Sequence, residues 1–261
     1  MNISIKGKNA LVGGSSKGIG KAIAVQLAAS GANVTLMARN EADLKTVVSE
    51  LDTALGQKHG YLLVDFSDFE SFNKVMTKFF KNATIDILVN NTQGPAGGGA
   101  LEKSVDDYQQ AFNLLFKSVV LTTQLALGNM QKNQWGRIIN VASISVKEPL
   151  SYLALSNSIR AAVVTWAKSL SIDVGKDGIT VNNILTGYFD TDRIASLNEK
   201  KAEKMGIFPH EVRTAMESQV PVKRIGKPEE YGYLVAFLAS DKAAYINGAN
   251  IPIDGGLLKS L

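Results

Sequence analysis

Cysteine is absent from this sequence, and histidine is almost absent. Without cysteine the chain can form no disulfide, no thiolate nucleophile and no cysteine-ligated metal site. The two histidines, His59 and His210, stand far apart in the sequence, so we expect no histidine-rich metal site either. The sequence therefore predicts a protein without a bound metal.

Long runs of charged or of apolar residues are also missing. The net charge of +4 is spread along the chain and forms no basic run with interleaved aromatic residues, so we expect no nucleic-acid partner. No apolar segment approaches membrane-spanning length by eye, and residues 1–6 lack the long apolar region of a signal peptide. These absences predict a cytoplasmic protein with no membrane partner.

The composition that remains is that of a globular protein. Of 261 residues, 45% are hydrophobic and 20% are charged. A chain of this length can bury a large core, and one α/β domain of this size is ordinary. Because no linker or low-complexity block divides the sequence, we predict a single domain over residues 1–261.

Residues 8–39 form the most distinctive unit of the sequence. An apolar segment at 9–12 is followed by a glycine-rich turn at 13–20, a helical run at 21–30 and a second apolar segment at 33–37. Strand, glycine turn, helix and strand in this order are typical of the βαβ unit whose helix N-terminus faces a phosphate. A glycine-rich surface loop is the alternative, but the flanking strand and helix favour nucleotide binding.

Three glycines of this turn have separate physical tasks. Gly14 permits a tight turn, whereas Gly18 and Gly20 allow the backbone to approach a pyrophosphate and the strand to pack on the helix.

Strands and helices alternate along the rest of the chain. Apolar segments predict strands at 60–64, 85–89, 136–142, 178–184 and 249–253, and amphipathic segments predict helices at 41–55, 71–81, 105–130, 152–174 and 229–239. The polar stretch 190–219 is helical in tendency but is interrupted by Gly206 and Pro209. This alternation predicts an α/β fold with a doubly wound parallel sheet.

The chain resembles the short-chain dehydrogenase/reductase family along its whole length, and within it the 3-oxoacyl-[acyl-carrier-protein] reductase-like members. The resemblance rests on Gly14-x-x-x-Gly18-Ile-Gly20, Asp65, Asn90-Asn91, Asn113, and the segments 136–143, 187–191 and 224–256. It implies a Rossmann fold with seven parallel strands and helices on both faces, NAD(H) or NADP(H) as cofactor, and a homotetramer or homodimer. The segment 190–219 is then expected to cover a small-molecule or acyl-thioester substrate.

Lys17 and Arg39 decide which cofactor we expect. An acidic residue after the second strand would accept the ribose hydroxyls of NAD and repel a 2′-phosphate, but residues 38–40 are Ala-Arg-Asn. Two cations at the adenosine end favour the 2′-phosphate, so NADP(H) is predicted over NAD(H). A solvated surface charge is the alternative interpretation of each.

The residues expected to contact the cofactor, several of them by resemblance alone, are Gly14, Ser16, Lys17, Gly18, Ile19, Gly20, Arg39, Asn40, Asp65, Phe66, Asn91, Arg160, Gly187 and Thr191. Thr186 stands where the family usually has a proline before the glycine.

The catalytic set implied by the resemblance is Asn, Ser, Tyr and Lys, with Tyr-x-x-x-Lys on the long helix after the fifth strand. Asn113 and Ser143 fit the first two places. Aligning that helix through residues 167–170 puts Ser156 and Arg160 in the other two, so Ser-x-x-x-Arg replaces Tyr-x-x-x-Lys. This is the main departure from the family pattern.

The departure weakens the acid and keeps the cation. A serine hydroxyl ionises far less readily than a phenol of pKa about 10, and arginine holds a positive charge but cannot relay a proton. Tyr152 would lie one turn before Ser156 if the helix has already begun, and could supply the acid. Tyr188 is a second candidate, although a wall of the substrate pocket suits it better. The alternative for Ser156 and Arg160 is a polar helix face in an inactive relative.

Three functions remain open from the sequence. The first is NADP(H)-dependent reduction of a carbonyl, such as a 3-oxoacyl thioester or a small ketone. The second is reduction of the C=C bond of an enoyl or dienoyl thioester, whose enolate oxygen needs only hydrogen-bond donors such as Ser143 and Ser156. The third is an NADP(H)-binding sensor or regulator without catalysis.

Overall fold

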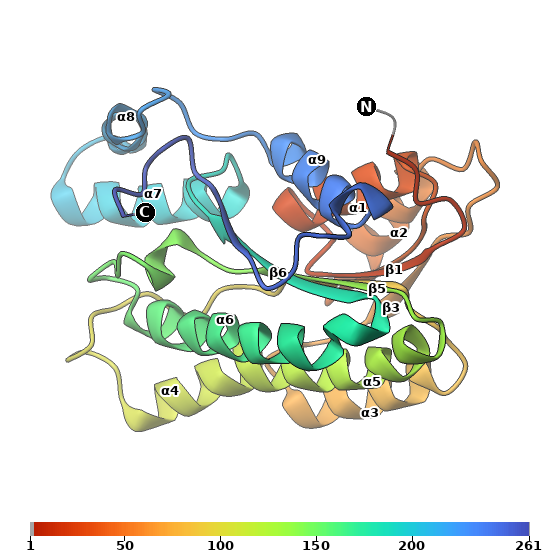
Figure 1. Cartoon of the computed structure of the whole chain (residues 1–261). Coiled ribbons are helices and arrows are strands. Elements are labelled where there is room, and N and C mark those ends of the chain that lie inside the picture. The colour runs from red at the N-terminus through yellow and green to blue at the C-terminus, as the bar shows by residue number, and fades with distance from the viewer. Residues whose placement is uncertain (1–2, 261) are drawn as a thin grey trace.

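The computed structural model describes residues 3–260, which form one parallel sheet with helices on both faces (Figure 1). The strand order of this seven-stranded sheet is β3-β2-β1-β4-β5-β6-β7. The strands are β1 Asn9–Gly13, β2 Asn33–Ala38, β3 Gly60–Leu63, β4 Ile87–Asn90, β5 Gly136–Val141, β6 Ile179–Thr186 and β7 Asn250–Ile253. The helices are α1 Gly18–Ala29, α2 Glu41–Glu50, α3 Phe69–Phe80, α4 Val105–Phe112, α5 Ser118–Lys132, α6 Ala154–Val174, α7 Asp192–Met205, α8 Pro209–Gln219 and α9 Pro228–Leu238. The predicted fold class is confirmed.

Two apolar cores lie on opposite faces of the sheet. One contains side chains of α1, α2 and α9, and the other contains side chains of α3, α5 and α6 (Figure 1). Ile138 and Ile139, neighbours in β5, enter different cores because successive side chains of a strand point to opposite faces. Strands covered on both faces must be apolar throughout, which explains the short apolar runs of the sequence.

The two long helices differ from their predicted form. The helix expected at 105–130 contains a π-helical turn, Asn113–Lys117, between α4 and α5. The helix expected from residue 152 begins only at Ala154, so Tyr152 lies outside it. The backbone N–H of Gly98 donates to the carbonyl of Tyr152 at 2.8 Å, and the N–H of Ala154 donates to that of Gly98 at 3.1 Å. This short bridge to a distant loop holds the chain out of the helix.

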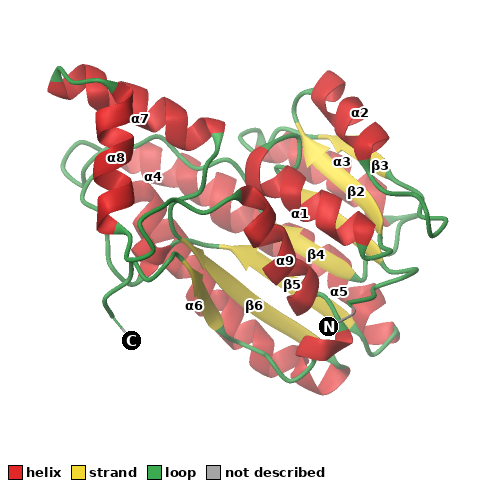
Figure 2. Ribbon diagram, turned by 90° about the horizontal axis from the view of Figure 1, so that it is seen from above, coloured by secondary structure: helices red, strands yellow, loops and turns green. Residues whose placement is uncertain are grey.

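The polar stretch before α9 forms α7 and α8, which lie together beyond the carboxyl end of β6 (Figure 2). Gly206 ends α7 with a φ of +66°, a left-handed conformation that glycine adopts without strain. Pro209 is the first residue of α8, where its missing N–H would have no helical partner. Both predicted interruptions are confirmed.

A ladder of asparagine side chains crosses four neighbouring strands. The amide of Asn90 donates to Asn140 at 2.9 Å, that of Asn140 donates to Asn183 at 2.9 Å, and that of Asn183 donates to Asn250 at 2.8 Å. Each pair also occupies matched positions in the strand register. Asn90 donates a further bond to Thr123 of α5 at 3.1 Å. We call these four residues the asparagine ladder.

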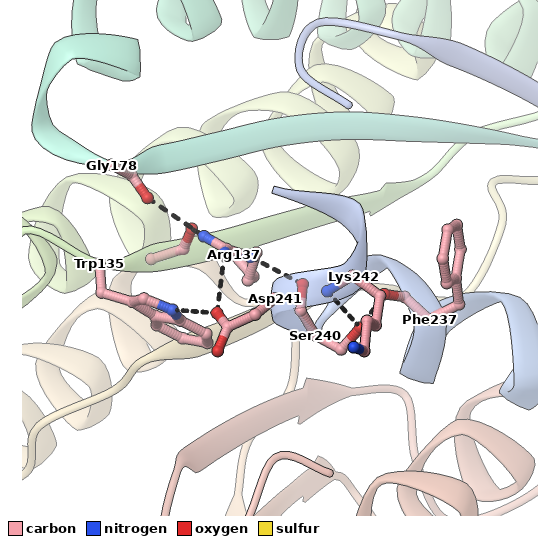
Figure 3. Close-up of polar contacts among 8 residues, drawn as sticks. Trp135, Arg137, Gly178, Phe237, Ser240, Asp241 and Lys242 are labelled. Carbon is pink, nitrogen blue, oxygen red and sulfur yellow. Dashed lines mark hydrogen bonds and ion pairs between the residues drawn. The ribbon is translucent and has the colours of Figure 1, made fainter. Parts of the chain in front are cut away.

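A second polar cluster lies at the amino end of β5 (Figure 3). The side chain of Arg137 is only 3% exposed, and it contacts Asp241, after α9, at 3.3 Å. It also donates to the carbonyls of Gly136 at 2.8 Å and Gly178 at 3.1 Å, while Trp135 Nε1 donates to the same Asp241 oxygen at 2.8 Å. Burial lowers the pKa of Arg137, and the charge of Asp241 opposes that shift. The cluster joins β5 to the end of α9.

One helix corrects the expectation that no segment approaches membrane-spanning length. Within the described residues, Val105–Lys132 is a continuous helix of 28 residues that is apolar enough to cross a membrane. Length and composition alone are weak evidence for a membrane-spanning helix, because the core helix of a soluble protein passes the same test. Here α5 packs against α3 and β5, and Ala126 and Met130 are fully buried. The apolar character of the helix is explained by this packing.

We predict that replacing Asn140 with alanine lowers the free energy of unfolding by about 2–3 kcal/mol, because it removes the acceptor of one buried Asn90 N–H and the donor to the buried Asn183 side-chain oxygen. Urea denaturation measures the loss. As a control, Asn82→Ala removes an exposed asparagine and should change the value by less than about 0.5 kcal/mol. Equal losses in the two variants would contradict a role of the ladder in holding the strands.

Candidate active site

The glycine turn lies where the strand order reverses, between the carboxyl ends of β1 and β4. The backbones pass so closely there that a Cβ on Gly13 would lie 2.2 Å from the carbonyl oxygen of Asn91, and one on Gly20 would lie 2.1 Å from that of Gly14. Gly14 and Gly18 have φ values of +54° and +57°, in the left-handed region. The tight turn at Gly14 and the close packing of strand and helix at Gly20 expected from the sequence are both present, and the approach to a pyrophosphate stays a prediction.

Ser15 anchors this turn, and the sequence analysis did not single it out. Its buried hydroxyl donates to the carbonyl of Val12 at 2.9 Å and accepts from the backbone N–H of Met37 at 3.0 Å. Ser15 therefore ties the turn to both neighbouring strands. Ser16, which the sequence predicts to contact the cofactor, is half-buried and lines a cavity.

No side chain caps the N-terminus of α1, because its N-cap residue is Lys17, whose ammonium group cannot accept from the backbone N–H groups. The first N–H groups of a helix are therefore available to an anion. Lys17 extends to Asp192, with 3.2 Å between Nζ and Oδ2. Lys17, Gly18 and Thr191 share the lining of a cavity of about 490 Å³. The structure thus brings the glycine turn and the segment before α7 together.

Some of the residues expected at the adenosine end of the cofactor form hydrogen bonds within the fold. Arg39 is exposed and forms no ion pair among the described residues. The Asp65 carboxylate accepts from the N–H of Ser67 at 2.9 Å and from its hydroxyl at 2.6 Å, and this bonding, with a smaller contribution from Arg39, lowers the pKa of Asp65. The Asn40 side-chain oxygen caps α2 by accepting from the N–H of Ala42 at 3.0 Å.

Phe66 and Asn91, two further residues expected to contact the cofactor, line a small cavity beside the glycine turn. Phe66 is 7% exposed and packs on Phe72, with 5.1 Å between ring centroids, so its side chain belongs to the core. The amide of Asn91 donates to the carbonyl of Gly13 at 3.0 Å and so holds the glycine turn. Both line a cavity of about 10 Å³, which has room for about one water.

Asn113 begins the π-helical turn between α4 and α5. Such turns occur frequently at functional sites because they re-aim side chains within a helix. The side-chain oxygen of Asn113 accepts from Gln109 Nε2 at 3.1 Å, and the turn packs against α6. Ile19 lies half-buried in the first turn of α1.

Ser143, Ser156 and Arg160 lie at the carboxyl end of β5. Ser143 follows that strand and its hydroxyl accepts from the N–H of Ser145 at 3.1 Å. Arg160 Nε donates to Ser156 Oγ at 3.2 Å, one turn away on α6, and Nη1 donates to the carbonyl of Val141. The spacing predicted a shared helix face, and this contact confirms it.

The surroundings of Arg160 are mainly neutral or positive. Burial lowers its pKa to about 10, with a further lowering from the charge of Arg193 on α7. Arg160 therefore stays protonated at neutral pH. Tyr231 is fully buried nearby, and its hydroxyl lies 3.0 Å from that of Thr186. Burial raises the pKa of Tyr231, against the charge of Arg160.

Tyr152 does not stand where the helical spacing predicted it. Because α6 begins at Ala154, Tyr152 does not lie one helical turn before Ser156. Its side chain is 50% exposed and hydrogen-bonds to Tyr188. Burial of its hydroxyl and the neighbouring Tyr188 raise the pKa of Tyr152 to about 12. The two tyrosines form a pair, which the sequence did not indicate.

Gly187 and Thr191 lie between β6 and α7. A Cβ on Gly187 would lie 2.6 Å from the Cα of Asp254, so the chain after β7 passes directly over it. The Thr191 side chain caps α7 and its methyl group would lie 3.3 Å from a Cβ on Gly18. Sequence reasoning missed Arg193, two residues further on, because no motif marks it.

Known proteins share this architecture along the whole chain. A family model described as enoyl-(acyl carrier protein) reductase matches residues 14–258. The 3-oxoacyl-[acyl-carrier-protein] reductase FabG of Aquifex aeolicus is 31% identical over 98% of this chain and 100% of its own length. The chain belongs to the short-chain dehydrogenase/reductase family.

Two further members of the short-chain dehydrogenase/reductase family are similar along their whole length. The NADPH-dependent reductase BacG of Bacillus subtilis is 31% identical over 97% of this chain and 99% of its own. L-sorbose reductase from Gluconobacter frateurii, whose structure contains NADPH and L-sorbose, aligns with a TM-score of 0.92 and 31% identity, covering 100% of both chains. The family is thus shared by reductases of different substrates.

Proposed function

We propose that this protein is an NADP(H)-dependent oxidoreductase that reduces a carbonyl group, either of a 3-oxoacyl thioester or of a small ketone. One observation carries the proposal. The hydrogen-bonded pair of Ser156 and Arg160 lies on α6 against the carbonyl of Val141, at the strand edge that also bears Ser143 and the glycine turn. The activities named for FabG and for L-sorbose reductase support it.

The residues at this edge fit a dinucleotide. The glycine turn packs tightly on its own neighbours, with Gly13 against Asn91 and Gly20 against Gly14, and no side chain caps the α1 N-terminus that follows it. Lys17 and Arg39 would hold the 2′-phosphate, and Arg160 the hydroxyls of the nicotinamide ribose. Bound NADPH would supply the hydride.

The chain's own groups would bind and orient the substrate. Ser143 would donate a hydrogen bond to the carbonyl oxygen as negative charge develops there. Ser156, held by Arg160, would donate a second bond or the proton. The pKa of Tyr152, about 12, would keep its hydroxyl protonated at neutral pH. Hydrogen-bonded to Tyr188, Tyr152 is the alternative proton donor. Asn113 would position the chain between α4 and α5.

A second function, reduction of an enoyl or dienoyl thioester, is favoured by the same two serines. Serine in place of the usual tyrosine is a weak acid but a good hydrogen-bond donor, and an enolate oxygen needs donors more than immediate protonation. The description of the matching family model also names an enoyl reductase. A panel of carbonyls and conjugated alkenes with NADPH separates the two functions.

We predict that the protein binds NADPH more tightly than NADH, and that Arg39→Ala removes most of this preference. A charge-assisted bond to the 2′-phosphate contributes about 1.5–3 kcal/mol, which is roughly 10- to 100-fold in affinity. Fluorescence titration with both cofactors measures it, with the exposed Lys58→Ala as control. Equal affinities of the unmodified protein for NADPH and NADH would refute the prediction.

We predict that Ser156→Tyr combined with Arg160→Lys raises carbonyl reduction by roughly 10²–10⁴-fold, the usual contribution of a well-placed general acid. Arg160→Lys alone should change little, since lysine then has no phenol to activate. Steady-state kcat with NADPH is the measurement. If the double variant still binds NADPH but its turnover is unchanged, Ser156 does not occupy the position of the general acid. Tyr152 is then the remaining candidate for that role.

Ser143→Ala tests whether the protein is an enzyme at all. Turnover should fall by roughly 10²-fold or more through loss of a donor to the oxygen, while NADPH affinity stays within about 2-fold. If the unmodified protein binds NADPH and reduces no carbonyl and no alkene, the third function, a cofactor-binding sensor, replaces the proposal.

A further inference from the structure

Arg160 of α6 and Arg193 of α7 each carry a guanidinium group without a carboxylate partner among the described residues. The acidic residues on either side of Arg193 are engaged elsewhere. Asp190 pairs with Arg213 at 2.8 Å and Asp192 pairs with Lys17 at 3.2 Å.

The position of Arg193 is unfavourable for the fold by itself. It lies in the first turn of α7, where the helix dipole favours anionic side chains and opposes cations. Its charge also acts against that of Arg160, whose pKa it helps to lower. Because Arg193 is exposed, water screens both contributions, but no counter-charge among the described residues offsets them.

The contacts of Arg193 leave most of its donors free. Its Nη2 donates to the carbonyl of Pro95 at 3.3 Å, and the guanidinium lies against Gly94, where a Cβ would be 2.6 Å from Nη2. A guanidinium has five N–H donors, so four have no acceptor among residues 3–260 and, because Arg193 is exposed, are open to water or to a ligand. The contact with the loop after β4 brings the group from α7 to the edge of the sheet where the glycine turn and Ser143 lie.

We propose that Arg193 binds a carboxylate of the substrate, so that the protein reduces a small oxo acid and not a neutral ketone. This inference rests on the proposed carbonyl reduction. The planar fork of arginine fits a carboxylate with two parallel hydrogen bonds. The phosphate of an acyl-carrier arm does not fit equally well, because it lies at the far end of a long chain from the thioester, whereas Arg193 acts within electrostatic reach of Arg160 and Ser156.

The test compares 2-, 3- and 4-oxo acids with their methyl esters, using NADPH. We expect at least one acid to be reduced with a kcat/KM at least 10-fold above that of its ester. Arg193→Gln should lower kcat/KM for the acid at least 10-fold, mainly through KM, and leave the ester within about 3-fold. Lys200→Gln removes an exposed charge from the same helix and should change neither.

Three readouts distinguish this inference from its alternatives. NADPH affinity of Arg193→Gln should stay within 2-fold, and a larger fall would assign Arg193 to the cofactor phosphates and overturn the inference. The melting temperature of ligand-free Arg193→Gln should equal or exceed that of the unmodified protein, and a clear drop would indicate a structural role instead. Arg193→Lys should retain part of the preference for the acid, and its complete loss would contradict charge recognition.

Failure of the proposed function has a separate signature. If no carbonyl is reduced, binding decides the inference. Millimolar oxo acid should then raise the melting temperature of the NADPH-loaded protein but not of NADPH-loaded Arg193→Gln. The absence of this difference, or equal reduction of acid and ester by the unmodified protein, would overturn it.

Discussion

The asparagine ladder ties four neighbouring strands together, and three of these strands lead to residues of the site. Asn90 and Asn183 bond through Asn140 at matched positions, which are the last residue of β4, the next-to-last residue of β5 and the middle of β6. A parallel strand that slips by one residue would turn its amide to the other face and leave the neighbouring amides unpaired in the core. With the ladder in place, Asn91, Ser143 and Gly187 emerge along one edge. The ladder therefore helps to fix the register of the strands that lead to these three residues.

The glycine turn shows how little tolerance this arrangement has. Gly13 passes so close to the Asn91 carbonyl that even a methyl group would collide, and the Asn91 amide bonds back to the Gly13 carbonyl. Because Asn91 directly follows the first residue of the ladder, the register of β4 also sets the height of the turn. Ser15 completes the attachment to β2. The register of the sheet and the position of the glycine turn in the nucleotide site therefore depend on each other.

The site itself carries charge that the fold leaves uncompensated. Arg160 is held by a hydroxyl and a carbonyl, not by an acid, and Arg193 adds a second positive charge from α7. By contrast, the buried Arg137 at the opposite end of β5 has Asp241 as its counter-charge (Figure 3). Arg193 is exposed to solvent, whereas the Arg160 guanidinium is largely desolvated, and a desolvated cation without a counter-charge costs stability. The arginines at the two ends of β5 therefore differ in their partners, because only Arg137 has a carboxylate.

The sequence by itself determined the features that depend on neighbouring residues. Alternating apolar segments indicated the strands and helices, the glycine spacing indicated the turn, and the four-residue spacing of Ser156 and Arg160 was enough to put them in contact. Only the tertiary structure decided features that depend on contacts distant in sequence. Tyr152 lies outside α6 because the chain next to it pairs with Gly98. Asn113 lies in a π-helical turn, and Arg193 contacts the loop at Pro95. Local periodicity is written in a short window of residues, whereas these positions follow from how separate segments meet around the sheet.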